Sequence, residues 1–163
     1  MVRSWFSSKG PLLGPWGRPL PRRGPAYSVG SILIFRLLDR FPDLLGVVAH
    51  LGAPDFGDFL ALAEAAPTLR LDTAMVFGGP GAIGTFPARL HERLGALGDR
   101  VLFGSDFPTL PWQFAGQLGG LAALGLGEEW LRAVLWRNGA RLLGLDADPD
   151  GGGVGRRLPA VGW

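Results

Sequence analysis

The sequence predicts an α/β fold with a parallel sheet, because short apolar runs alternate with longer segments of helical periodicity. Strands that alternate with helices of ~10–15 residues indicate right-handed βαβ units, in which neighbouring strands run parallel. Two of the apolar runs also reach a side chain suited to chemistry: VVAHLG at 47–52 contains His50, and VLFGSDFP at 101–108 contains Asp106. In parallel α/β proteins the functional groups lie at the carboxyl ends of the strands, so His50 and Asp106 are the candidate site residues.

Local signals place the individual elements from residue 28 onward. Strands are expected at residues 47–49, 69–73 and 101–105. Helices are expected at residues 28–41, 59–66, 87–97, 114–124 and 128–143. Ser28 or Ser31 can cap the first helix, and Pro42 ends it. The expected core-facing residues of the first and last helices are Ile32, Leu33, Phe35, Leu37 and Leu38, and Leu131, Val134, Leu135, Asn138 and Leu142.

Three strands are too few to close a barrel, since a (β/α)8 barrel takes about 250 residues. The pattern fits the last third to half of such a TIM barrel, meaning the last three or so β/α units with carboxyl-terminal helices, and it also fits a small open sheet. Residues 28–145 are expected to form this domain. Residues 1–27 are rich in Pro, Gly and Arg and are expected to be irregular, and residues 146–163 are expected to be a disordered tail.

Composition excludes several classes of protein. A hydrophobic fraction of 47% and a charged fraction of 18% are typical of a globular domain, and the absence of cysteine excludes disulfides and thiolate metal sites. The net charge of +2, without basic residues clustered on one face, argues against a nucleic-acid partner. The uncharged stretch 107–127 contains two prolines, two glutamines and repeated glycines, so no membrane span is expected. The amino terminus lacks the apolar core of a secretory signal, which favours a cytoplasmic protein.

Each candidate residue has a simpler alternative. Asp106 stands in a Ser-Asp-Phe-Pro turn, where an Asp often only hydrogen-bonds its own backbone. His50 could be a buried imidazole that is satisfied by backbone groups. Asp72 and Thr73, at the end of the second strand, could support a neighbouring functional residue or serve only a turn. His91 lies beside Glu92 and Arg93 and is expected to be a solvated surface histidine.

Five motifs carry a resemblance to a known family through their order and spacing. They are RFPDL at 40–44, VVAHLG at 47–52, LDT at 71–73, LFGSDFP at 102–108 and NGARLLGL at 138–145. Together they resemble the carboxyl-terminal half of the amidohydrolase-related family, in the branch that contains aminocarboxymuconate-semialdehyde decarboxylase and related metal-dependent hydrolases. The resemblance covers about residues 28–145. It implies a metal-dependent (β/α)8 barrel in which Asp106, after the eighth strand, is a metal ligand and His50, after the sixth strand, assists the metal-bound water or the substrate.

The resemblance also identifies what the sequence lacks. The family binds its metal chiefly through a His-x-His pair at the first strand and a further His at the fifth, whereas this sequence has only His50 and His91. A catalytic zinc needs three protein ligands and an open position, and His50 and Asp106 supply at most two. We therefore expect an incomplete ligand set for a divalent metal ion, with zinc as the first choice, in a chain that lacks the amino-terminal metal-binding half and is inactive or weakly active alone. A complete site would hydrolyse or decarboxylate a small-molecule carbonyl or carboxylate substrate.

Two other functions stay open. The segment GPGAIG at 79–84 matches the G-x-G-x-x-G pattern of dinucleotide-binding loops, with Asp106 at the end of the next strand as a ribose-binding acid, although Pro80 stiffens that turn. Alternatively, the chain is a non-catalytic interaction domain: a barrel fragment whose exposed sheet edge and apolar helix faces need a partner, which could be a second copy in a homo-oligomer.

Overall fold

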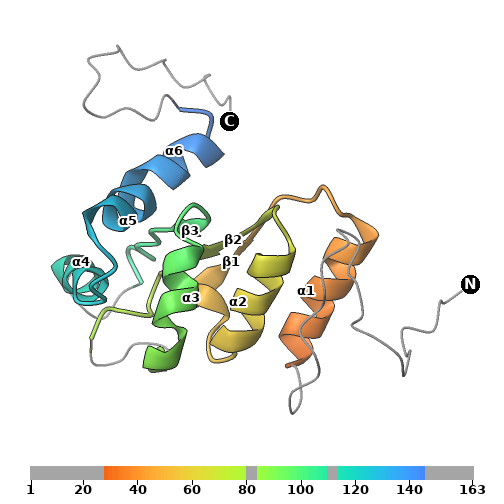
Figure 1. The fold of residues 1–163 in the computed structure, drawn as a ribbon, viewed down its shortest axis with the longest axis horizontal. Coiled ribbons are helices and arrows are strands. Elements are labelled where there is room, and N and C mark those ends of the chain that lie inside the picture. Colours follow the sequence, from red (N-terminus) through yellow and green to blue (C-terminus); the bar gives the residue numbers. More distant parts are fainter. Residues whose placement is uncertain (1–27, 80–83, 110–113, 146–163) are drawn as a thin grey trace, which may run out of the picture.

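The computed structural model describes residues 28–79, 84–109 and 114–145, and it has the expected α/β fold (Figure 1). In chain order the elements are α1 (Val29–Arg40), β1 (Gly46–Val48), the 3-10 helix η1 (Ala49–Gly52), α2 (Phe56–Ala65), β2 (Leu69–Asp72), the 3-10 helix η2 (Ala88–Leu90), α3 (His91–Ala96), β3 (Val101–Leu102), α4 (Phe114–Ala122), α5 (Glu128–Arg132), the π-helix η3 (Ala133–Arg137) and α6 (Asn138–Leu142). The predictions for residues 1–27 and 146–163 lie outside the described residues. No helix in the described ranges is long and apolar enough to cross a membrane.

The three strands form a parallel sheet in the order β1-β2-β3, as the alternation of elements predicts. Gly46 of β1 is in register with Leu69 of β2, and Leu71 of β2 is in register with Val101 of β3. β1 has the expected length but begins one residue earlier, whereas β2 and β3 are shorter than expected. In particular, β3 stops at Leu102 because the next backbone N–H, that of Phe103, donates to the carbonyl of Val134 at 3.0 Å instead of to a strand.

Helices cover the sheet and form the core with it. In Figure 1, α1, α2 and α3 stand next to one another along the sheet, whereas α5 and α6 lie beyond β3. The side chains of Leu60, Leu69, Leu71, Leu94 and Val101 are fully buried in one hydrophobic cluster between α2, α3 and the sheet. Burying a side chain of this kind contributes roughly 1.5–3 kcal/mol each. This core fixes the carboxyl ends of the strands, where the candidate residues lie.

The first helix begins as predicted but does not bury the predicted stripe. Ser28 is the N-cap, and its side chain accepts a hydrogen bond from the N–H of Ser31. Leu38 is buried and Phe35 is partly buried, but Leu33 is 59% exposed, and Ile32 and Leu37 are exposed as well. The expectation that all five residues face the core is therefore wrong, because α1 is the outermost of these helices and, among the described elements, packs chiefly against α2.

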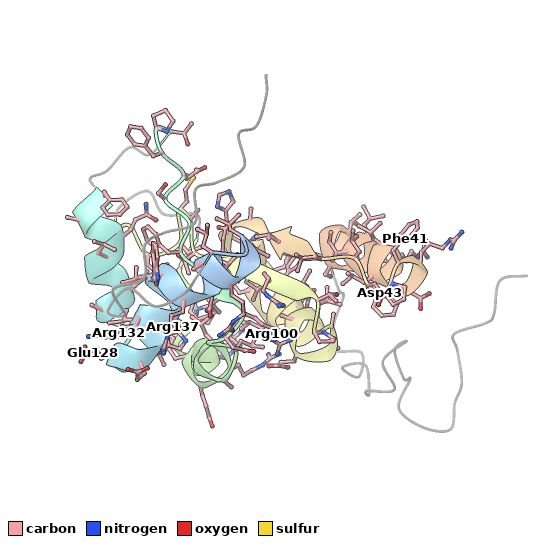
Figure 2. All side chains as sticks on the ribbon, turned by 90° about the horizontal axis from the view of Figure 1, so that it is seen from above. Phe41, Asp43, Arg100, Glu128, Arg132 and Arg137 are labelled. Atoms are coloured by element: carbon pink, nitrogen blue, oxygen red, sulfur yellow. The ribbon has the colours of Figure 1, made fainter. Side chains whose placement is uncertain are left out.

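The last predicted helix is present but contains a π-turn. The segments α5, η3 and α6 follow one another without a break from Glu128 to Leu142. Trp130, Val134 and Asn138 are buried, whereas Leu135 is exposed, so the predicted core face is wrong at that residue. The π-turn adds a residue to the helical turn and thereby changes which side chains face the core. Charged residues take the outer side: Figure 2 shows Glu128, Arg132 and Arg137 grouped at one end of the view, far from Phe41 and Asp43.

Candidate site at the carboxyl ends of the strands

The parallel sheet brings three polar residues to the end of the sheet at which its strands terminate. His50 follows β1 by two residues, Asp72 is the last residue of β2, and Asp106 follows the end of β3 by four residues. Because the strands are parallel, their carboxyl ends lie at the same end of the sheet. Since β2 is the middle strand and neighbouring strands lie about 4.8 Å apart, β1 and β3 are separated by roughly 10 Å. Asp72 stands between these two strands, which lead to His50 and Asp106.

The backbone at His50 is held in an unusual conformation. His50 and its neighbour Leu51 both have a left-handed backbone, with φ values of 57° and 52°. For residues other than glycine such a conformation costs about 1–3 kcal/mol and persists only where the surroundings fix it. Here Leu51 is fully buried, and the carbonyl of His50 accepts a hydrogen bond from the N–H of Ala53 at 2.9 Å. The tight turn therefore sets the direction of the imidazole.

Asp72 holds this turn through a single carboxylate oxygen. Its Oδ1 accepts a hydrogen bond from the backbone N–H of His50 at 3.0 Å and another from the backbone N–H of Ala74 at 2.9 Å. Charge-assisted hydrogen bonds of this kind are roughly twice as strong as neutral ones. Both alternatives that the sequence leaves open for Asp72 have a contact: the bond from Ala74, two residues on, closes a local turn, and the bond from His50 links Asp72 to the candidate site.

The imidazole of His50 is partly buried, and one of its two ring nitrogens contacts a backbone carbonyl. Its Nδ1 lies 2.9 Å from the carbonyl oxygen of Ala74. A carbonyl only accepts hydrogen bonds, so this contact favours the tautomer in which Nδ1 carries the proton and donates. In the neutral ring, Nε2 is then the nitrogen with a lone pair, which is the atom a general base or a metal ligand uses.

Asp106 forms a turn through its backbone, and its carboxylate has no partner among the residues that the structure describes. Its carbonyl accepts hydrogen bonds from the N–H and the hydroxyl of Thr109, at 2.9 and 2.6 Å, and its own φ is 51°. Within the described residues the carboxylate accepts no hydrogen bond and forms no ion pair. The turn proposed as the simpler alternative is therefore present, but the acidic group itself does not serve it.

Two further residues near the carboxyl ends of the strands were not identified from the sequence. A Cβ on Gly104 would come within 2.9 Å of Asp72 Oδ1 and 2.8 Å of the Cβ of Ala74, so only glycine fits there. Gln117 of α4 is buried, and its Nε2 donates to the carbonyl of Ser105 at 3.0 Å. The glycine in the LFGSDFP motif is a sequence signal for the close approach of Gly104 to Asp72. The hydrogen bond from Gln117 to Ser105 has no such signal, because it depends on the packing of a distant helix.

The described residues do not form a complete metal centre. No group of three or more His, Cys, Asp or Glu side chains in the described ranges is arranged to hold a metal ion. Asp72 Oδ1 already accepts two backbone hydrogen bonds. His50 and Asp106 alone are fewer than the three protein ligands that a catalytic zinc requires. The donor set therefore does not fit a catalytic metal ion without further ligands.

The remaining candidates lie elsewhere. His91 begins α3, where it is partly buried with its ring stacked on Phe86 at a centroid distance of 5.8 Å, so it packs against a core side chain and is not simply a solvated residue. The dinucleotide-loop candidate at 79–84 falls largely outside the described residues, since the structure does not describe residues 80–83.

A comparison with known protein families gives one result. The family model described as Amidohydrolase matches residues 30–145, which are most of the chain. No curated protein matches the chain. The matched residues include all three strands, His50, Asp72 and Asp106.

Proposed function

Because the chain belongs to the amidohydrolase family, we propose that it contributes His50 and Asp106 to a centre that hydrolyses or decarboxylates a small carbonyl or carboxylate substrate. The domain of this family is a TIM barrel, and its members generally use a divalent metal ion. The observation that supports the proposal is the position of both residues after parallel strands. They follow the carboxyl ends of these strands, where the active sites of barrel enzymes lie.

We further propose that the described residues correspond to the last three or so β/α units of the barrel, in the branch that resembles aminocarboxymuconate-semialdehyde decarboxylase. The exposure of β1 supports this. Val47 is 48% exposed, and β1 pairs with β2 alone, so its other edge lacks a neighbouring strand among the described residues. In a closed barrel that edge pairs with the preceding strand. The missing metal ligands would belong to the preceding strands, and Asp106 would be one ligand of the completed centre.

In this proposal His50 handles the proton. The lone pair on Nε2 accepts a proton from the attacking water or from the substrate and returns it to the leaving group. An imidazole suits this task because one ring nitrogen can accept a proton while the other donates a hydrogen bond. The two left-handed residues and the hydrogen bond to Ala74 hold the ring in one orientation, which is what proton transfer at a defined distance requires.

The metal-ligand role of Asp106 is tested by titrating Zn²⁺ or Mn²⁺ into the purified chain and measuring the affinity by calorimetry. With two ligands at most, we expect binding to be weak in the wild-type chain, and Asp106→Asn to weaken it by roughly tenfold or more without unfolding the protein. Asp99→Asn is the matched control, because Asp99 is an exposed carboxylate before the amino end of the same strand. Equal affinity in the Asp106→Asn variant and the wild type would contradict the ligand role.

A second candidate function rests on exposed apolar residues of the first two elements. Val29, Leu33, Phe41 and Leu45 are exposed in α1 and the segment that follows it, and Val47 of β1 is exposed as well. Such a surface is typical of an interaction site, and a barrel fragment that binds a partner without catalysis would use it. Concentration-dependent association, with no effect of His50 or Asp106 substitutions on metal affinity, would favour this function over the enzymatic one.

A further inference from the structure

We propose that Asp72 is a positioning residue for His50, because its carboxylate holds the carbonyl of Ala74 against Nδ1 and thereby keeps Nε2 unprotonated. The inference rests on the role proposed for His50, and it names a residue that supports that role without touching the substrate. It follows from a closed set of hydrogen bonds at the ends of β1 and β2.

The hydrogen bonds form a ring of contacts through one oxygen atom. The backbone N–H of His50 and the backbone N–H of Ala74 both donate to Oδ1 of Asp72, at 3.0 and 2.9 Å. The contact that closes the ring is the 2.9 Å hydrogen bond between His50 Nδ1 and the carbonyl oxygen of Ala74. The side chain of His50 and the acceptor that fixes its proton are thus both attached, through their own backbones, to the same carboxylate.

Backbone conformation adds a reason why this carboxylate is needed. His50 lies in a left-handed turn, and Met75, directly after Ala74, also has a left-handed backbone with a φ of 58°. Both segments are held in conformations that residues other than glycine seldom adopt. Asp72 accepts a hydrogen bond from the N–H of His50, in the first segment, and from the N–H of Ala74, directly before Met75. Without it, both turns lose a common anchor and the Ala74 carbonyl is free to move away from Nδ1.

The position of the proton matters for the chemistry. A neutral imidazole with no partner populates both tautomers, and only the form protonated on Nδ1 leaves Nε2 able to accept a proton. The hydrogen bond at one nitrogen therefore decides what the other nitrogen can do. A carboxylate that fixes the Ala74 carbonyl controls the tautomer of His50 without contacting the imidazole.

The test is the tautomer ratio of His50, measured by long-range ¹H–¹⁵N NMR on the metal-free full chain at a pH where the ring is neutral. The second histidine, His91, serves as an internal reference, and a His91→Gln variant assigns the two sets of signals. We expect the wild-type ring to be protonated on Nδ1. Asp72→Ala is expected to shift the Nδ1–H to Nε2–H ratio by about fivefold, which corresponds to the net effect of one hydrogen bond. Asp72→Asn, which keeps an oxygen acceptor, is expected to retain most of the wild-type ratio.

The control is a carboxylate with a similar structural task elsewhere. Oδ2 of Asp58 accepts hydrogen bonds from the N–H of Ser28 and the hydroxyl of Ser31, each at 3.1 Å. Asp58→Ala should therefore destabilise the fold while leaving the tautomer ratio of His50 unchanged. A residue that only supports the fold would behave in the same way at position 72.

Two results would overturn the inference. One is a folded Asp72→Ala variant with the wild-type tautomer ratio. The other is a wild-type His50 protonated on Nε2, which needs no variant and decides the matter even if Asp72→Ala does not fold. Because the measurement uses metal-free protein, it separates this inference from the proposed function. If Asp106→Asn bound metal as tightly as the wild type, the ligand role of Asp106 would be overturned, but the tautomer result for His50 would stand.

Discussion

The backbone of Gly104 lies so close to the carboxylate of Asp72 that a Cβ on residue 104 would come within 2.9 Å of Oδ1. The segment that leads from β3 to Asp106 therefore runs directly beside the oxygen that binds the backbone N–H of His50. Asp72 therefore lies beside the segments that lead from β1 and β3 to the two candidate residues.

The first prediction concerns this close approach. Gly104→Ala should lower the free energy of unfolding by about 1–3 kcal/mol, the usual effect of forcing extra atoms into a packed site. The neighbours cannot yield cheaply, because they are a backbone nitrogen, a methyl group and a hydrogen-bonded carboxylate oxygen. Urea denaturation measures the change.

The control for Gly104→Ala is Gly57→Ala. A Cβ at Gly57, in the first turn of α2, meets nothing within 4 Å, so this substitution should be neutral or slightly stabilising. If both variants had the same stability, the close approach at Gly104 would not be a constraint on the fold.

The second prediction concerns the attachment of the last helices to the sheet. Asn138 is buried, and its Nδ2 donates to the carbonyls of Gly98 and Val101, at 2.6 and 2.8 Å. Asn138→Ala should cost about 2–3 kcal/mol, because two hydrogen bonds are lost and the carbonyls of Gly98, before β3, and Val101, in β3, lose this partner. Thermal or urea unfolding checks this value.

A surface variant of the same helical segment provides the comparison. Arg132 forms an exposed pair with Glu128 one turn away, at 3.0 Å, and such pairs contribute about 0.3–0.5 kcal/mol. Arg132→Ala should therefore change the stability far less than Asn138→Ala. The prediction for Asn138 fails if the two variants are equally stable.

Local patterns predicted much of this fold. Apolar runs and prolines gave the order of the elements, the parallel sheet and the Ser28 cap, because each depends on residues near one another in the sequence. The end of β3 at Leu102, the exposure of Leu33 and the burial of Trp130 were not predicted. Each depends on which distant element packs on that residue, and periodicity alone does not contain this information.

The candidate site divides in the same way. His50 and Asp106 were identified because both follow short apolar runs, a signal that needs no knowledge of tertiary contacts. The partners of His50 could not be assigned from the sequence. The hydrogen bond from the N–H of His50 to Asp72 joins residues 22 positions apart, and the one between Nδ1 of His50 and Ala74 joins residues 24 positions apart. Both therefore exist only once β1 and β2 pair.

The third prediction concerns the exposed apolar surface of α1. Leu33→Ser should leave the free energy of unfolding within about 0.5 kcal/mol of the wild type, because the side chain is largely exposed. If this surface mediates association, the same variant should lower the apparent mass at high protein concentration in light scattering. Leu38→Ser, in the buried side of the same helix, should instead unfold or strongly destabilise the chain. Unchanged association in a folded Leu33→Ser variant would exclude Leu33 from the contact.

The last prediction separates backbone strain from steric collision at two glycines with positive φ. Gly52 follows His50 and Leu51 with a φ of 75°, and a Cβ there would lie 2.0 Å from the Phe59 ring. Gly125 has a φ of 67°, but a Cβ there meets nothing within 4 Å. Gly125→Ala should therefore cost only the backbone term of about 1–2 kcal/mol. Gly52→Ala adds a collision with a buried ring and should cost well beyond that, with loss of the His50 turn visible as a changed His50 NMR signal. Equal destabilisation of the two variants would mean that Phe59 moves aside, and the turn at His50 would then be less firmly held than the packing of Leu51 and Phe59 indicates.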